Sequence, residues 1–388
     1  MKITKEIYFK NFKKKKNDNK ILNLLNKLLL EDNSILKSFK ESYKDSYKKN
    51  IILKLKKYSN INLIGMGGSI LGSKAIFSFF LKKIKKNFYF IDNFELSKFN
   101  YKNRKKQLNL IVSKSGDTLE TISSSNVIVS KSQKNIFITE NKKSYLMNLA
   151  KKLKSEIVYH NNFIGGRYSV LSEVGMLPAQ LMGLNPNKFR RFNFLINNKK
   201  FINALVQNVS NTLYLIKRKK FNSVILNYDD NSRDLFLWYQ QLVAESLGKK
   251  NKGILPIVSE MPRDNHSLMQ LYLDGFKNNF YTFFFVKESS SEKIINNKIL
   301  KSYSYLKNKS LNDIKLSQFQ ATEKIFTKKL IPFRSFLINK RNEETLGELF
   351  VFFMLETILL GKALNVNPYD QPDVELIKTE TKKFLINF

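Results

Sequence analysis

From residue 61 to about residue 160, short apolar runs alternate with longer stretches in which apolar residues recur at helical spacing. This alternation predicts βαβ units, in which parallel strands are joined by helices that pack on the sheet. The expected strands are 61–65, 88–91, 108–113, 135–139 and 156–159. The expected helices are 69–82, 118–133, 144–154 and 170–183.

A second series of the same kind follows a polar stretch, Asn185–Lys200, after which apolar runs resume. We therefore expect an α/β fold with two doubly wound halves, each a mainly parallel central sheet flanked by helices. Residues Asn367–Pro372 break the pattern before a last helix, Asp373–Leu385. The expected strands here are 223–227, 280–286 and 329–333, and the expected helices are 232–247, 311–328 and 343–363.

The chain of 388 residues is long enough for two domains of ordinary size. Its first residues are rich in lysine and only weakly amphipathic, which indicates a helical segment over 1–50. The predicted domains are then 51–184 and 201–388, the second including the C-terminal helix, with 185–200 as a linker.

The chain contains no cysteine, which excludes disulfides, thiolate metal sites and a cysteine nucleophile. This composition suits a reducing compartment, and Met1–Lys16 has no apolar core of the kind found in signal peptides. The most apolar stretches, Phe280–Val286 and Leu349–Gly361, are too short to cross a bilayer. We therefore expect a cytoplasmic protein without a membrane partner.

The formal net charge is +36, a value that raises the possibility of a nucleic-acid partner. The basic residues are spread along the whole chain, however, and nearly all of them are lysine, alongside abundant Asn, Ile and Phe. These four residues share A/T-rich codons, so a biased genome explains the charge and we expect no nucleic-acid partner. The excess can still steer an anionic substrate at low salt.

Glycines are scarce, and several gather where a predicted strand, Ile61–Gly65, turns into a helix. The start of a helix offers unpaired N–H groups and the positive end of its dipole, and glycine lets an anion approach the backbone. Gly68 and the hydroxyl of Ser69 are the candidate ligands of such an anion. A tight turn without ligand and a dinucleotide turn are alternatives, the latter with Asp92 as its sole candidate for a ribose contact.

A second loop, after strand 108–113, carries the hydroxyls of Ser113, Ser115 and Thr118 and the cation of Lys114. Convergent hydroxyls at the carboxyl end of a strand fit a phosphate monoester, although Ser and Thr also cap helices in the absence of a ligand. Neither loop ends in the Gly-Lys-Ser/Thr of a P-loop, so a nucleoside triphosphate is not expected. Together the two loops predict a phosphate site.

Six segments resemble, in order, the motifs of glucose-6-phosphate isomerases, which are built from sugar-isomerase (SIS) domains, and the spacing is similar to that of the shorter bacterial members. The resemblance extends over residues 61 to 378 and implies two SIS-type domains. The segments are Gly65-Met-Gly-Gly-Ser-Ile-Leu-Gly72, Ser113-Lys-Ser-Gly-Asp-Thr-Leu-Glu-Thr121, Gly165-Gly-Arg-Tyr-Ser-Val-Leu-Ser-Glu-Val-Gly175, Glu245-Ser-Leu-Gly-Lys249, Asn265-His-Ser-Leu-Met-Gln-Leu271 and Gln371-Pro-Asp-Val-Glu-Leu-Ile-Lys378.

The resemblance implies reversible conversion of glucose 6-phosphate to fructose 6-phosphate through an enediolate, as in glycolysis and gluconeogenesis. This chemistry needs a positioned base and a cation near the developing oxyanion. By resemblance, Glu245 is the base that moves a proton between C1 and C2, and Arg167 stabilises the enediolate. Gln241 and Gln371 would contact the sugar.

The resemblance also assigns ring opening to His266 and Lys378, with His266 reaching the site from the neighbouring subunit of a homodimer. Histidine titrates near neutrality, which suits a proton moving to or from a ring oxygen. Asp264, two residues before His266, could orient its imidazole. The other histidine, His160, matches no motif, and the two have no metal-ligand spacing, so we expect neither a metal nor a cofactor.

Two other functions remain open at this point. The first is an isomerase that also accepts mannose 6-phosphate. The second is a non-catalytic SIS regulator, which would keep the phosphate loops without needing Glu245, His266 or Lys378. Such regulators usually add a helix-turn-helix, and the first 50 residues show no clear one.

Overall fold

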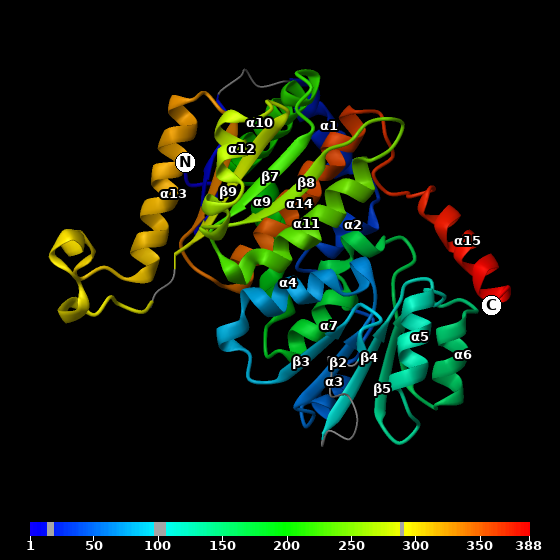
Figure 1. Cartoon of the computed structure of the whole chain (residues 1–388). Coiled ribbons are helices and arrows are strands. Elements are labelled where there is room, and N and C mark those ends of the chain that lie inside the picture. The colour runs from blue at the N-terminus through cyan, green and yellow to red at the C-terminus, as the bar shows by residue number, and fades with distance from the viewer. Residues whose placement is uncertain (14–18, 97–105, 288–290) are drawn as a thin grey trace.

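The computed structural model describes residues 1–13, 19–96, 106–287 and 291–388, and two five-stranded sheets organise it (Figure 1). In the first sheet the strand order is β3-β2-β4-β5-β6, and all neighbours are parallel. Its strands are β2 (Asn60–Ile64), β3 (Asn87–Ile91), β4 (Gln107–Val112), β5 (Lys134–Thr139) and β6 (Glu156–Tyr159).

The second sheet has the order β1-β10-β9-β7-β8, with β1 antiparallel at one edge and the other neighbours parallel. Its strands are β1 (Ile7–Lys10), β7 (Asn222–Asn227), β8 (Leu255–Glu260), β9 (Asn279–Val286) and β10 (Phe333–Ile338).

The parallel strands of both sheets follow the same winding order. In the first sheet β2 lies between β3 and β4, and in the second β7 lies between β8 and β9. From the first parallel strand of each sheet (β2 or β7), the chain crosses to the neighbour on one side. From the third (β4 or β9), it continues toward the opposite edge of the sheet. Open α/β sheets bind ligands at the carboxyl ends of the strands where this reversal occurs, which here means β2/β4 and β7/β9.

Helices lie on both faces of each sheet, so the predicted α/β class with two doubly wound sheets is confirmed. On the first sheet, Ile64 and Phe137 face the helices α5 and α6, whereas Leu63 and Leu110 face the core shared with α4 and α7. The helices are α1 (Asn19–Leu30), α2 (Ser34–Ser38), α3 (Lys49–Leu55), α4 (Leu71–Phe79), α5 (Leu119–Ile128), α6 (Tyr145–Lys152), α7 (Glu173–Leu181), α8 (Pro186–Phe189), α9 (Phe192–Ile196), α10 (Lys199–Lys217), α11 (Arg233–Leu247), α12 (Met269–Asp274), α13 (Leu311–Lys328), α14 (Glu343–Ala363) and α15 (Val374–Ile386).

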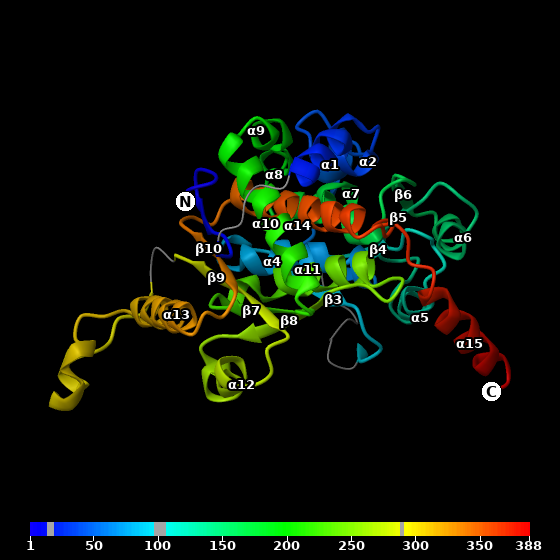
Figure 2. The same cartoon turned by 90° about the horizontal axis from the view of Figure 1, so that it is seen from above.

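Helix α14 forms the centre of the second half. Every residue from Thr345 to Gly361 is buried, as expected for a helix that is packed on all sides. Its neighbours include α1, α8, α10 and α11, and Figure 2 shows α1, α2, α8 and α9 gathered on one side of it. Helix α11 also packs along α4, which joins the two halves of the chain.

The N-terminal segment differs from the lysine-rich helix that we expected over 1–50. Residues Ile7–Lys10 form β1, which pairs with β10 at the edge of the second sheet. Alternate side chains of β1 are buried, Ile7 and Phe9 among them, so this strand closes the core. Helix α1 follows, and Leu25 and Leu28 on its inner face are also buried.

Several predicted elements need correction. The strand expected at 329–333 begins instead at Phe333, because α13 runs to Lys328 and Pro332 lacks the N–H that a ladder needs. Strand β8 and helix α10 were not expected at all. The helix expected over 170–183 is divided, with a 3₁₀ turn before Ser172 and α7 after it.

Residues 185–200, expected as a linker, contain α8, α9 and the start of α10. Phe189, Arg190 and Phe192 within this stretch are buried. The division of the chain into domains stays a prediction.

Candidate active site

The loop after β2 packs against the backbone of two other segments through its glycines. A Cβ on Gly65 would lie 2.9 Å from the carbonyl oxygen of Val112 at the end of β4. A Cβ on Gly68 would lie 2.1 Å from the carbonyl carbon of Gly166, so no side chain can occupy this position. Gly68 thus allows the loop to meet the turn that carries Arg167, next to Ser69 and the start of α4.

The loop after β4 brings its hydroxyls together before α5. The Oγ of Ser113 and the Oγ1 of Thr118 are 2.9 Å apart, and the N–H of Gly116 donates to Ser113 Oγ at 3.2 Å. Gly116 has a φ of 74°, in the left-handed region that favours glycine. The Oγ of Ser115 accepts from the N–H of Asp117 at 3.2 Å, so this loop is held by its own hydroxyls.

The ammonium of Lys114 has partners outside its own loop. Its Nζ donates to the carbonyl oxygen of Asn162 at 2.8 Å and lies 3.5 Å from Glu140 Oε1. Lys142 pairs with the other oxygen of Glu140 at 2.8 Å. The ammonium of Lys114 is therefore engaged at the edge of the predicted phosphate site.

Arg167 is the hub of the site and is almost fully buried, with 2% of its surface exposed. Its Nε donates to Ser246 Oγ at 2.8 Å, and its Nη1 donates to Gln371 Oε1 at 2.7 Å. Its Nη2 donates to the carbonyl oxygens of Pro368 at 2.8 Å and Asp370 at 3.0 Å. One guanidinium thus ties the glycine-rich turn to the end of α11 and to the segment before α15.

Helix α11 supplies two further side chains that were predicted from the sequence. Glu245, in its last turn, has one carboxylate oxygen 3.1 Å from Arg167 Nη1 and keeps 23% of its side chain exposed. Gln241, one turn earlier, lies against Gly67, where a Cβ would be 2.7 Å from its Nε2. The Oε1 of Gln241 is buried and has no hydrogen-bond partner among the described residues.

The segment before α15 is anchored by Lys249. The Nζ of Lys249 donates to the carbonyl oxygen of Asp370 at 2.6 Å and to its carboxylate at 2.8 Å, and it also reaches the carbonyl of Asn367. This hydrogen bond and the ammonium charge lower the pKa of Asp370 below its usual range. Gln371 is thereby held next to Arg167.

His266 lies apart from this cluster. It ends a short 3₁₀ turn, Arg263–His266, after β8, and its side chain is exposed. Asp264 does not orient the imidazole as we expected. Its carboxylate accepts from Ser259 Oγ at 2.9 Å, from the N–H of Glu260 at 2.8 Å and from Ser267 Oγ at 3.1 Å, and these bonds hold its pKa below its usual range despite partial burial.

Lys378 also lies outside the cluster. It belongs to α15, which has no buried residue and projects from the body of the molecule (Figure 1). Its Nζ donates to Glu375 Oε1 at 2.6 Å on the same helix. Within one chain, the structure therefore brings Arg167, Glu245, Gln241 and Gln371 together but not His266 or Lys378.

Two residues of this site had no predicted role. Ser246 accepts from Arg167 and lies 2.9 Å from the hydroxyl of Tyr168, which also donates to the carbonyl of Pro368 at 3.0 Å. Both residues stand within motifs that carry the resemblance, Ser246 directly after Glu245 and Tyr168 directly after Arg167. This position in the motifs was the one sequence feature that could have pointed to them. Burial raises the pKa of the Tyr168 hydroxyl, which keeps it protonated as a donor.

The described part of the chain contains no group of three His, Asp or Glu side chains arranged to hold a metal ion. In the same residues, no helix combines the length and the apolar character needed to cross a membrane.

Comparisons with known proteins agree with the motifs. The family model for phosphoglucose isomerase matches residues 31–387. A glucose-6-phosphate isomerase of Methanocaldococcus jannaschii is 35% identical over 341 residues, which are 82% of this chain and 82% of the relative.

Among solved structures, a hypothetical protein of Thermus thermophilus has a TM-score of 0.81 at 24% identity and covers 95% of this chain and 94% of its own. A glucose-6-phosphate isomerase of Chlamydia trachomatis has a TM-score of 0.70 at 18% identity, covering 90% of this chain and 77% of its own. These two structures share the fold. The family model and the curated relative confirm the resemblance read from the sequence, and the chain belongs to the phosphoglucose isomerase family.

Proposed function

We propose that this chain interconverts glucose 6-phosphate and fructose 6-phosphate. The observation that carries the proposal is the 3.1 Å approach of the Glu245 carboxylate to the Arg167 guanidinium, next to two loops suited to a phosphate. Isomerisation of an aldose needs a base and a neighbouring positive charge, and the site supplies both without a metal.

In the proposed reaction, the Glu245 carboxylate removes the proton from C2 of the open-chain aldose. The electron pair of the broken C–H bond forms the C1–C2 double bond, and the carbonyl pair moves onto O1 to give an enediolate. The Arg167 guanidinium stabilises this oxyanion. The hydroxyl proton on O2 passes to O1, and the protonated Glu245 then returns its proton to C1 as a carbonyl forms at C2, so no atom is gained or lost.

The phosphate of the substrate would lie between Ser69 and the loop that holds Ser113, Ser115 and Thr118. The backbone N–H groups near Gly68 and these hydroxyls are the donors that a phosphate monoester needs. The hydroxyls at present bond to each other and to backbone groups, as Ser113 does to Thr118, and a bound phosphate would take over these bonds. Gln241, which lies against Gly67, and Gln371, which accepts from Arg167, would contact the sugar hydroxyls.

We place ring opening with His266 and Lys378, and we propose a homodimer in which His266 serves the partner's site. This arrangement accounts for the exposure of His266, which lies outside the cluster of its own chain. It is supported by α15, a helix without a buried residue, on which Leu376, Ile377 and Phe384 are more than two-thirds exposed. A second copy would cover such an apolar face.

We also propose that the protein acts in the cytoplasm. A phosphorylated sugar is a substrate of that compartment, and a chain without cysteine suits its reducing conditions. Neither a cofactor nor a nucleic acid enters the proposed chemistry.

A coupled assay tests the function directly. Purified protein is given fructose 6-phosphate with no added metal or isomerase cofactor, and glucose 6-phosphate is measured with a dehydrogenase. We expect turnover that saturates with substrate and persists after treatment with a chelator. Absence of glucose 6-phosphate under these conditions, with a correctly folded protein, would overturn the proposal.

A further inference from the structure

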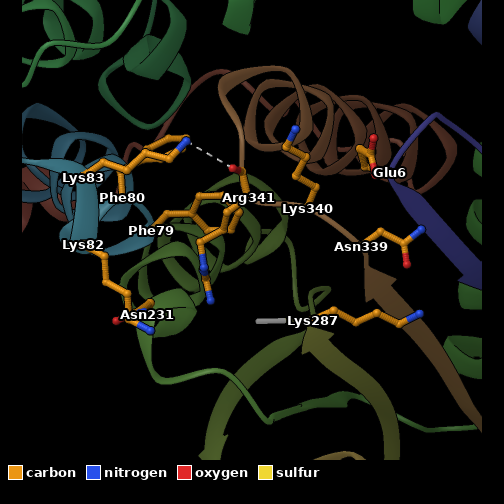
Figure 3. Close-up of a pocket in the computed structure, with 10 residues that line it drawn as sticks. All are labelled: Glu6, Phe79, Phe80, Lys82, Lys83, Asn231, Lys287, Asn339, Lys340 and Arg341. Carbon is orange, nitrogen blue, oxygen red and sulfur yellow. Dashed lines mark hydrogen bonds between the residues drawn. The ribbon is translucent and has the colours of Figure 1, made fainter. Parts of the chain in front are cut away.

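A pocket of about 650 Å³ lies between the end of α4 and the second sheet (Figure 3), and it shares no lining residue with the Arg167–Glu245 cluster. Its lining comes from the end of α4, from the segments that follow β7, β9 and β10, and from Glu6, just before β1. Asn231 follows β7, Lys287 follows β9, and Lys340 and Arg341 follow β10.

This pocket occupies the same topological position in its sheet as the proposed phosphate site does in the first sheet. The phosphate loops follow β2 and β4, the pair of strands between which the winding direction reverses. The segments with Asn231 and Lys287 follow β7 and β9, the equivalent pair in the second sheet. The general position at which open α/β sheets bind ligands is therefore present twice in this chain.

The charges around the pocket favour an anion. Five cationic side chains line it, from three separate parts of the chain, and Glu6 is the single carboxylate among the lining residues. The buried carboxylate of Asp229 bonds to Arg341 and compensates that one guanidinium. Three positive charges therefore remain in excess around a concave surface. The five are Lys82, Lys83, Lys287, Lys340 and Arg341.

A high lysine content alone does not explain this arrangement. Lys82 and Lys83 follow the C-terminus of α4, where a helix dipole attracts cations, and the Nζ of Lys83 donates to the carbonyl of Arg341 at 3.4 Å (Figure 3). Lys287 and Lys340 follow strands, and Lys340 precedes the N-terminal end of α14, which disfavours a cation. Neither ammonium has a hydrogen-bond partner among the described residues, so both can bind a ligand.

We propose that this pocket binds the phosphate group of a small phosphorylated metabolite at a site separate from the isomerase site. Lysines from several segments can converge on the oxygens of one phosphate, which a single surface lysine cannot hold. Helix α4 separates the two sites, with the phosphate loop at its start and the pocket at its end. Its nine residues span about 13 Å at 1.5 Å per residue, which is too far for one phosphate to contact both sites.

The proposal goes beyond isomerisation and is tested by binding. Sodium pyrophosphate, a multivalent phosphate without a sugar, is titrated calorimetrically into the full chain at low ionic strength. The phosphate-loop variant Ser69→Ala/Thr118→Ala, in which binding at the isomerase site is weakened, is titrated beside the wild type. We expect one binding event to persist in this variant.

The matched variants are Lys287→Gln/Lys340→Gln in the pocket and Lys188→Gln/Lys199→Gln on the exposed surface, which remove the same charge. When each pair is added to the phosphate-loop variant, the pocket pair should weaken pyrophosphate binding at least ten-fold and the surface pair less than two-fold. Equal weakening by both pairs would mean attraction by net charge only and would overturn the proposal, as would the absence of any binding event. Because Lys287 and Lys340 lie outside the isomerase site, the pocket pair should leave isomerase turnover unchanged in the absence of pyrophosphate. The binding result therefore does not depend on whether the proposed isomerase function is correct.

Discussion

The Arg167 guanidinium holds the Glu245 carboxylate at 3.1 Å while donating to Gln371 at 2.7 Å. Three segments that are distant in sequence therefore meet at one buried cation. The acid that would move the proton lies beside the charge that would stabilise the oxyanion, so a single carbon–oxygen unit of a substrate can contact both. Because the contact is with Glu245 Oε1, substrate entry must share or replace it.

Replacement of Glu245 by Gln should remove the base while preserving the shape of the side chain. We expect kcat to fall by about 10²–10⁴-fold, the usual contribution of general base catalysis. The affinity for the sugar phosphate should change only a few-fold, because the phosphate loops are untouched. Steady-state kinetics and calorimetric binding of fructose 6-phosphate separate the two effects.

Glu156→Gln is the matched control for this experiment. Glu156 pairs with Lys134 at 3.1 Å on the edge of the first sheet, far along the chain from α11. Its replacement should leave kcat within two-fold of the wild type. Near-normal turnover of Glu245→Gln would show that another group is the base.

The sequence predicted the first sheet well because each of its strands is built around two or more consecutive apolar residues. Strand β8 gave no such signal, since it begins with an exposed Leu255 and a proline and lies at a sheet edge. Strand β1 was hidden because its partner, β10, lies more than 300 residues away in sequence, and no local pattern reports that pairing. Helix α10 was missed because its buried face includes Asn208 and Asn211, which interrupt the apolar periodicity.

The candidate site was predictable only as a set of motifs. Glycine and arginine are scarce in this chain, which drew attention to Gly68 and Arg167, and their contact appears only in the folded structure. The bonds from Arg167 to Gln371 and Asp370 cross about half of the chain, and a sequence does not reveal such a contact. The contribution of Ser246 depends on the exact direction of one hydroxyl, which spacing cannot supply.

Loss of two hydroxyls from the phosphate loops should weaken substrate binding. Each hydrogen bond to a charged group is worth about 1.5–3 kcal/mol, so Ser69→Ala/Thr118→Ala should raise KM for fructose 6-phosphate at least ten-fold. Ser130→Ala/Ser132→Ala is the control, because this pair of hydroxyls, 2.9 Å apart, is exposed outside the loops. An unchanged KM in the first variant would show that the phosphate binds elsewhere.

Mixed subunits test whether His266 serves the partner's site. Glu245→Gln and His266→Asn chains, each inactive alone, are co-expressed with different tags so that the mixed dimer can be purified. A site made of Glu245 from one chain and His266 from the other is then intact, so the mixed dimer should regain about half of the wild-type activity per dimer in a symmetric arrangement with two sites. If both residues act within one chain, the mixed dimer stays inactive.

The contact between Gly68 and Gly166 predicts the effect of one added methyl group. In Gly68→Ala the new Cβ would lie 2.1 Å from a backbone carbon, and the turn carrying Arg167 would have to move. We expect the free energy of unfolding to fall by about 1–3 kcal/mol and kcat to fall with it. In Gly165→Ala the nearest atom is 3.7 Å away, so urea unfolding of that variant should match the wild type within about 0.5 kcal/mol.

Burial of Glu348 on α14 should make the stability depend on pH. Burial raises the pKa of Glu348 to about 7 from 4.5, although Arg191, whose Nε is 3.7 Å away, acts in the opposite direction. The folded state then holds a proton that the unfolded state has released, so stability falls as pH rises from 4.5 to 7 and levels off above 7. The full loss is about 3 kcal/mol by linkage.

Glu348→Gln should therefore flatten the decline in the free energy of unfolding between pH 5 and pH 7, as measured by urea denaturation at each pH. The variant should gain most over the wild type at pH 8, where the wild type carries a buried charge. Glu344→Gln is the control, because Glu344 is 37% exposed and pairs with the same Arg191 at 2.9 Å. An exposed carboxylate should not produce this slope, so equal flattening in both variants would place the effect in Arg191 and not in the burial of Glu348.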